Sequence, residues 1–118
     1  MIQPDWATEL IFKACELKGR KIPKVKWIKR NRFSTRGVTY HEPRFHKGFN
    51  ITVGLGTDEV GGKQVLLHEL THYLGRPKWH HNKRFWLLLR ELLIYFELHT
   101  DKYVSREVLY MSKAASYL

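Results

Sequence analysis

Apolar residues recur at helical spacing along the first part of the chain. From residue 5 to residue 18 they fall at every third or fourth position, and Gly19 then interrupts the pattern. This spacing places apolar side chains on one face, so we expect an amphipathic helix that begins near Pro4 and ends at Lys18. Its expected inner face consists of Trp6, Leu10, Ile11, Ala14 and Leu17.

Three short segments that follow have the patterns of strands. Basic and apolar residues alternate over residues 24–29, as they do in a strand with one buried face. Residues 36–42 and 49–55 are two further expected strands, and Pro43 and Gly48 bracket the connection between them. The glycines that come after residue 53 indicate a flexible approach to the next element.

A second helical pattern covers residues 63–74. Gly75 is a plausible C-terminal cap for this helix, and Pro77 prevents its continuation. A further helix is expected over residues 85–98 and a last one within residues 104–117. The order of elements predicts one α+β domain over residues 1–118. The apolar stripe of the 63–74 helix consists of Val65, Leu66, Leu70, Tyr73 and Leu74.

The middle of this second helix carries the sequence His-Glu-Leu-Thr-His at residues 68–72. Side chains four positions apart lie on one face of a helix, so His68 and His72 can bind the same metal ion. Glu69 projects toward the place of a metal-bound water. This H-E-x-x-H arrangement is typical of zinc metallopeptidases. A structural helix that carries two histidines by chance is the alternative, and the helix signals around the motif disfavour it.

A catalytic zinc ion usually has three protein ligands and one open position. Lys78 occupies the position where metzincins have a third histidine, so the chain is not a standard metzincin. Glu91 lies near the spacing of the thermolysin-like glutamate. His81 precedes the helical pattern at 85–98, and from a helix start it can turn back toward the preceding helix. The candidates for the third ligand are therefore His80, His81, Glu91 and Glu97.

The segment 68–86 resembles the SprT-like zinc metallopeptidases, and its His-Asn-Lys-Arg-Phe-Trp turn is similar to that of the bacterial YgjP type. The resemblance implies that His68, His72 and His81 bind zinc and that Glu69 is the general base. It implies a minimal zincin-like fold, in which a small antiparallel sheet of about three strands packs on the active-site helix. A third-ligand helix and flanking N- and C-terminal helices complete that fold. We expect an extended peptide substrate to add to the sheet along residues 49–55.

The expected reaction is peptide-bond hydrolysis by a zinc metalloendopeptidase. Glu69 would accept the proton of the zinc-bound water and deliver it to the leaving nitrogen. The metal could be another divalent ion, because histidine ligands do not select zinc by affinity alone. Candidate groups for stabilising the oxyanion are Tyr40, His41, Tyr73 and Tyr95.

Charge and cysteine content bear on the location and the partners of the protein. Cys15 is the single cysteine, and neither an apolar run of membrane-spanning length nor a secretory signal is evident, so we expect a cytoplasmic protein without membrane contact. The net charge is +10, and residues 18–36 contain nine Lys and Arg but no Asp or Glu. Such a run gives sequence-independent affinity for nucleic acids, so we expect nucleic-acid binding, and a solvated basic face or another acidic partner is the alternative.

Two aromatic residues, Trp27 and Phe33, lie within the basic run, where rings could stack on unpaired bases. Trp27 falls on the apolar phase of its strand and is therefore expected in the core. The SprT-like resemblance implies action on DNA-associated proteins, because eukaryotic members cleave proteins attached to DNA. The competing hypothesis is a nucleic-acid-binding module with a structural or vestigial zinc site. The candidate nucleic-acid-binding residues are Lys21, Lys24, Lys26, Lys29, Arg30 and Arg32.

Overall fold

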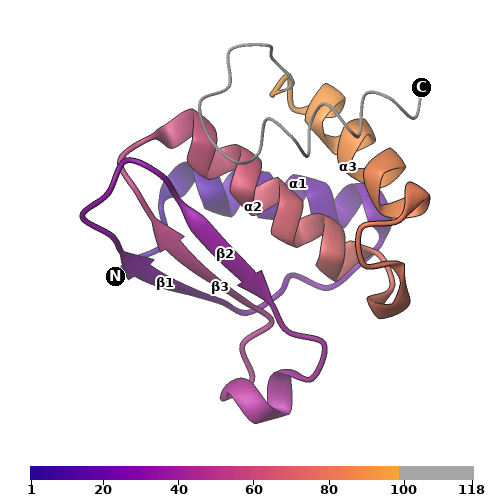
Figure 1. Cartoon of the computed structure of the whole chain (residues 1–118), viewed down its shortest axis with the longest axis horizontal. Coiled ribbons are helices and arrows are strands. Elements are labelled where there is room, and N and C mark those ends of the chain that lie inside the picture. The colour runs from indigo at the N-terminus through magenta and orange to yellow at the C-terminus, as the bar shows by residue number, and fades with distance from the viewer. Residues whose placement is uncertain (99–118) are drawn as a thin grey trace.

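The computed structural model describes residues 1–98 of the chain. Three α-helices and a three-stranded sheet make up this part, which confirms the predicted α+β class (Figure 1). The helix expected within residues 104–117 lies outside the described residues. In chain order the elements are α1 (Asp5–Lys18), β1 (Val25–Lys29), β2 (Arg36–Thr39), the 3-10 helix η1 (Pro43–His46), β3 (Ile51–Leu55), α2 (Glu59–Leu74), the 3-10 helix η2 (Pro77–Trp79) and α3 (Lys83–Tyr95).

The sheet is mixed, whereas the sequence predicted an antiparallel sheet. Its strand order is β1-β3-β2, with β1 parallel to β3 and β2 antiparallel to β3. Parallel neighbours need a long connection, and residues 30–50, which include β2 and η1, supply it here. The expected peptide-binding strand at 49–55 is therefore wrong: β3 has a partner on each side and cannot accept a third.

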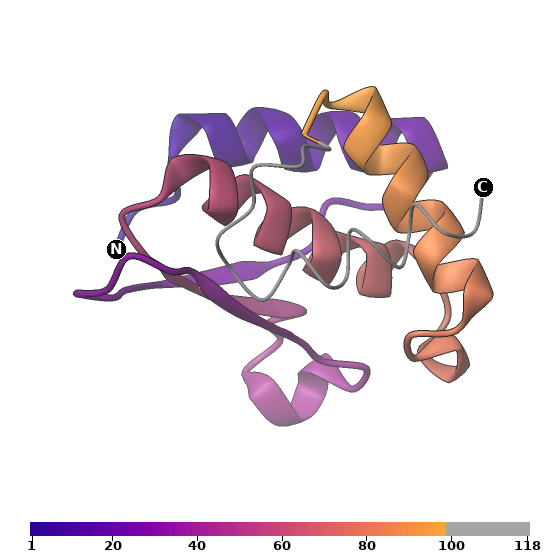
Figure 2. The same ribbon diagram turned by 45° about the horizontal axis from the view of Figure 1, so that its top comes forward.

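The helices α1 and α2 lie on one face of the sheet, and α3 packs against the C-terminal half of α2 (Figure 2). Leu66, Leu67 and Leu70 of α2 are fully buried, and Ile51 and Val53 of β3 meet this helix layer. Alternation along a strand leaves the intervening residues on the opposite face. The sheet therefore has one face covered by helices, and α2 is fixed against it.

Most of the predicted packing positions are buried. Leu10, Ile11 and Ala14 of α1 are buried and Trp6 is partly buried, but Leu17 is exposed and Cys15 is buried in its stead. The core position expected for Trp27 of the basic run is also confirmed. Trp27 is buried, and its indole Nε1 donates a hydrogen bond to Gln3 Oε1 at 2.8 Å.

The helix α2 begins four residues earlier than the pattern indicated. Gly61 and Gly62, which we expected in a flexible approach, are buried in its first turns. A Cβ atom on Gly62 would lie 3.3 Å from Leu55 Cδ1, so the missing side chain lets the helix start close to the sheet. Within residues 1–98, no helix is long and apolar enough to cross a membrane.

Candidate metal centre

Three histidines converge at one end of α2. His68 and His72 stand one turn apart on this helix, and His81 lies in the turn between η2 and α3. His81 Nε2 is 3.1 Å from His72 Nε2 and 3.3 Å from His68 Nε2. One nitrogen from each ring can be chosen so that all three lie within 4.8 Å of one another. Within the described part of the chain, no other group of three or more His, Cys, Asp or Glu side chains converges in this way.

The spacing of these nitrogens suits a tetrahedral metal ion. Zn–N bonds of about 2.0–2.1 Å in tetrahedral geometry separate neighbouring nitrogens by about 3.3 Å. The two Nε2 distances from His81 lie close to that value. Three imidazoles also leave the fourth position open, as catalytic zinc sites do. The donor set therefore fits zinc in both chemistry and spacing.

Aromatic rings from the start of α3 pack against the three histidines. The Phe85 ring stacks on His72 with centroids 4.3 Å apart and meets the edge of His68 at 5.0 Å. The Trp86 ring lies 5.5 Å from His81. Phe85 and Trp86 are almost completely buried, so their contacts restrict the orientation of the three imidazoles.

The approach of α3 to the cluster depends on how this helix begins. Asn82 is its N-cap, and the Asn82 side-chain oxygen accepts a hydrogen bond from the Phe85 backbone N–H at 3.1 Å. Asn82 is the residue directly after His81. The cap thus fixes the backbone next to the third histidine and places Phe85 beneath the cluster.

Two of the histidines are held in the neutral state. Burial, with the charges of His72 and His81 as further causes, lowers the pKa of His68 to about 3. Burial also lowers the pKa of His72 to about 4, with smaller effects from His81, His41 and His80. A metal ion binds the neutral imidazole, so these two rings are ready to bind one at neutral pH.

Glu69 is buried beside the histidines and is held by β2. The Thr39 hydroxyl donates a hydrogen bond to Glu69 Oε1 at 2.8 Å and lies 3.0 Å from the Glu69 backbone oxygen. A Cβ atom on Gly37 would lie only 2.6 Å from Glu69 Cγ. Burial raises the pKa of Glu69 to about 7, and the hydrogen bond from Thr39 opposes this rise. A carboxyl group with this pKa can accept and return a proton near neutral pH.

The remaining third-ligand candidates lie apart from the cluster. His80 is exposed and has a positive φ of 47°. Glu91 Oε2 pairs with Lys18 Nζ at 2.7 Å and so links α3 to α1. Glu97 follows α3 with a φ of 56°. Of the four candidates, the structure brings only His81 to His68 and His72.

The four candidates for oxyanion stabilisation lie in different surroundings. His41 lies near enough for its charge to lower the pKa of His72. The Tyr40 ring stacks on His46, and the Tyr73 hydroxyl donates a hydrogen bond to the Lys21 backbone oxygen at 2.6 Å. Tyr95 is exposed on α3, with its ring edge against Phe96. Of these four candidates, His41 is the one whose charge acts on a histidine of the cluster.

Sequence reasoning missed Thr39 and Gly37 as parts of the site. Both lie on the expected strand at 36–42, and alternation puts them on one face of it. The sequence contains no signal for which helix that face would meet. The contact to Glu69 depends on β2 lying at the edge of the sheet next to α2, and strand order could not be read from the pattern.

The basic candidates are distributed over both ends of β1. Lys24 and Lys26 lie at its start, and Lys24 Nζ sits 4.6 Å from the centroid of the Phe49 ring. Lys29 ends the strand, and beyond it Arg30 donates a hydrogen bond to the Ser34 backbone oxygen at 3.0 Å. Arg32 follows in the same connection, and Lys21 precedes the strand.

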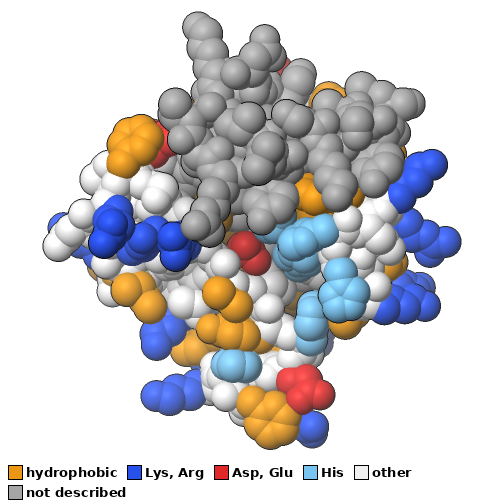
Figure 3. Space-filling model, viewed as in Figure 1, with side chains coloured by type: hydrophobic (Ala, Val, Ile, Leu, Met, Phe, Trp, Pro, Cys, Tyr) orange, Lys and Arg blue, Asp and Glu red, His pale blue; other side chains and the backbone are white. Residues whose placement is uncertain are grey.

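Histidine side chains gather on the face of the molecule that Figure 3 shows.

Searches of protein-family models, curated proteins and solved structures found no match to this chain. The similarity to SprT-like metallopeptidases therefore remains a prediction from the sequence. The candidate metal centre is inferred from the convergence of three imidazoles and from the buried carboxyl group beside them.

Proposed function

We propose that this protein is a zinc-dependent metalloendopeptidase in which His68, His72 and His81 bind the metal and Glu69 is the general base. The observation that carries this proposal is the convergence of three imidazole nitrogens from two separate segments next to a buried carboxyl group. A purely structural zinc site has four protein ligands and needs no base. When bound, zinc acts as a Lewis acid and lowers the pKa of water to about 7.

The proposed role of Glu69 is proton transfer. Its carboxylate accepts a proton from water as the water oxygen attacks the carbonyl carbon of the peptide bond. It then donates the proton to the leaving nitrogen, so the carboxylate is regenerated. The hydrogen bond from Thr39 supports this role because it fixes one carboxylate oxygen and leaves the other available for the water.

The strand β2 is the proposed site for the peptide substrate. Within residues 1–98, β2 pairs with β3 on one side and with no strand on the other. Its Gly37 and Thr39 contact Glu69, so a peptide paired along its outer edge would run past the base. Backbone hydrogen bonds to an exposed sheet edge are a general way to bind extended peptides. This proposal replaces the expectation for residues 49–55.

The substitution Glu69→Gln tests the proposed function. It removes the base but keeps the size of the side chain, so we expect peptidase activity to fall by about a hundredfold or more while bound zinc is unchanged. The measurements are cleavage of unfolded casein and zinc content. The matched control is Glu59→Gln, an exposed position in the first turn of the same helix, which should retain full activity.

A different result would favour the competing hypothesis. If the zinc-loaded protein cleaves no peptide substrate, or if Glu69→Gln and Glu59→Gln cleave equally well, Glu69 is not a general base. In the first case the protein would be a binding module with a structural or vestigial metal site, and in the second case it would cleave peptides without Glu69 as the base.

A further inference from the structure

A hollow of about 250 Å³ lies on the sheet face opposite α2, at the end where β1 and β3 begin. Lys26 of β1 and Thr52 of β3 are paired neighbours on this face, because Trp27 and Val53 beside them point into the core. The segment around η1, which lies below the sheet in Figure 1, forms the other wall of the hollow. Besides Thr52, the residues that line the hollow are Lys26, Tyr40, Phe45, His46, Lys47 and Phe49.

The charge of this hollow is positive. Lys26 and Lys47 line it, and within residues 1–98 no Asp or Glu does. Lys24 adds a third lysine over the Phe49 ring. The nearest carboxylate in sequence, Glu42, is exposed. A ligand that neutralises this surface must therefore be an anion.

Aromatic rings in the hollow are arranged so that further rings can stack on them. The Tyr40 and His46 rings stack with centroids 3.6 Å apart and planes 12° apart. The Phe45 side chain is 68% exposed, and the Arg44 guanidinium lies 4.8 Å from its ring centroid. An exposed ring next to cations offers a stacking surface for a planar base, and such stacking is tolerant of sequence.

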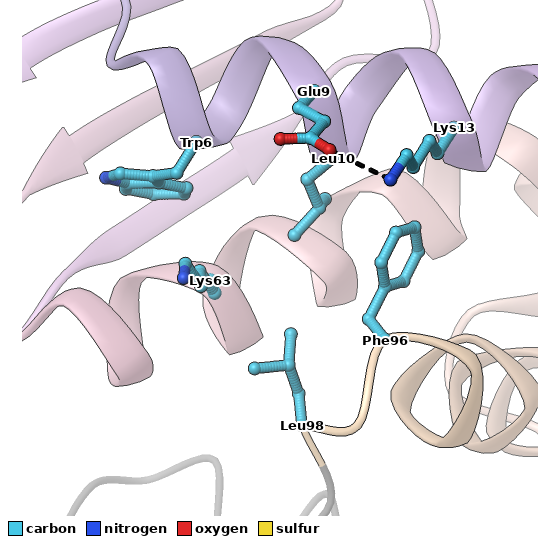
Figure 4. Close-up of a pocket in the computed structure, with 7 residues that line it drawn as sticks. All are labelled: Trp6, Glu9, Leu10, Lys13, Lys63, Phe96 and Leu98. Atoms are coloured by element: carbon cyan, nitrogen blue, oxygen red, sulfur yellow. Dashed lines mark ion pairs between the residues drawn. The ribbon is translucent and has the colours of Figure 1, made fainter.

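Another hollow of the molecule has a different character. It lies between α1, α2 and the end of α3 and is shown in Figure 4. Its two lysines are balanced by carboxylates: Lys13 Nζ is 2.8 Å from Glu9, and Lys63 Nζ is 3.8 Å from Glu59. The combination of unbalanced positive charge and accessible rings therefore distinguishes the hollow beneath the sheet.

We propose that the hollow beneath the sheet binds single-stranded nucleic acid. Lys26 and Lys47 contact phosphates, and Phe45 stacks on an unpaired base. A duplex keeps its bases stacked on one another, and an acidic peptide without aromatic residues has no ring for Phe45. The site is independent of the metal centre, and it moves the expected nucleic-acid contact from the whole 18–36 run to Lys24, Lys26 and the segment around η1.

The test is binding of a fluorescent oligothymidylate, measured by anisotropy at several salt concentrations. In the variant Lys26→Gln/Lys47→Gln, we expect affinity to fall about tenfold or more. The slope of log K against log salt should become shallower by about 1.4, at about 0.7 per lost phosphate contact on a single strand. Lys78→Gln/Lys83→Gln is the matched control, because both lysines are exposed near η2 and α3, away from the hollow. This control should bind nearly as the wild type does.

The substitution Phe45→Ala separates stacking from charge. Because Phe45 is largely exposed, the variant should fold normally, which circular dichroism will check. We expect affinity to fall about fivefold or more with an unchanged salt slope. Equal losses in the hollow and control lysine variants would overturn the proposal, and so would unchanged binding by Phe45→Ala. Competition by polyglutamate as strong as that by oligothymidylate would show an acidic-peptide site instead.

Discussion

Glu69 depends on two residues of β2 that carry no recognisable motif. Thr39 donates a hydrogen bond to its carboxylate, and Gly37 leaves the space that its side chain fills. In the proposed reaction both are positioning residues, because they contact the proposed base and not the proposed metal ligands. Each can be altered without removing a ligand to the metal, so their effects on the reaction can be separated from effects on metal binding.

The substitution Thr39→Val removes the hydroxyl and keeps the shape of the side chain. We expect kcat to fall about ten- to a hundredfold, the usual effect of losing a group that orients a site, with KM and zinc content nearly unchanged. Thr39→Ser should restore most of the activity because it returns the donor. A loss confined to KM, or failure of the serine variant to recover, would assign Thr39 a different role.

The substitution Gly37→Ala tests the close approach of β2 to Glu69. The new methyl group would lie 2.6 Å from Glu69 Cγ, so the carboxylate must move. Misplacement of a catalytic group by about 1 Å can cost about a hundredfold in rate, and we expect a loss of that order with zinc retained. Gly54→Ala is the matched control, since its methyl group would meet the flexible Arg30 side chain at 2.7 Å and the Arg36 backbone oxygen at an ordinary contact distance of 3.7 Å. Equal activity of the two variants would contradict the proposed role of Gly37.

The candidate metal centre depends on the start of α3. Asn82 caps this helix next to His81, and Phe85 and Trp86 in its first turn support the imidazoles. Zinc binding and the local stability of α3 should therefore be linked. The remaining ligand positions lie on α2, whose Leu66, Leu67 and Leu70 fix it in the core.

The substitution Asn82→Ala measures this link. Loss of a side-chain cap costs about 1 kcal/mol of stability, so we expect a lower midpoint in thermal unfolding. Weaker support of His81 should also reduce zinc affinity, as a competition titration with a chromophoric chelator would show. Asn82→Asp keeps the capping oxygen and should behave like the wild type. Unchanged zinc affinity in Asn82→Ala would show that the cap does not position His81.

The positions of the helices were predictable from the sequence, but the strand order and strand directions of the sheet were not. The period of apolar residues depends on local geometry, and it placed α1 and the 63–74 part of α2 correctly. The three strands were also located, but their order and directions depend on contacts between distant segments. For that reason β3 was taken for an open edge, whereas the structure places it between β1 and β2.

The site was predictable where its residues share one helix. The spacing of His68, Glu69 and His72 follows from helical geometry, so the motif sufficed for them. His81 was favoured over three other candidates because of its place before a helix, and the structure brings it to the other two histidines. Thr39 reaches Glu69 through tertiary contact alone, which no local pattern encodes.

The candidate metal centre and the positive hollow lie on different faces of the sheet. The histidines gather on the side of α2, and Lys26 and Lys47 line the opposite face. A net charge of +10 raises affinity for any polyanion, so only matched changes of charge can locate a specific contact. The proposed peptidase activity and the proposed nucleic-acid site can accordingly be tested one without the other.

The zinc content of purified variants, determined by elemental analysis after dialysis against buffer free of chelators, tests the metal centre most directly. We expect one zinc ion per chain in the wild-type protein and in His80→Ala, and little or none in His81→Ala. The two substitutions remove adjacent histidines, but only His81 lies with His68 and His72. Absence of zinc from the wild-type protein, or full retention in His81→Ala, would contradict the proposed centre.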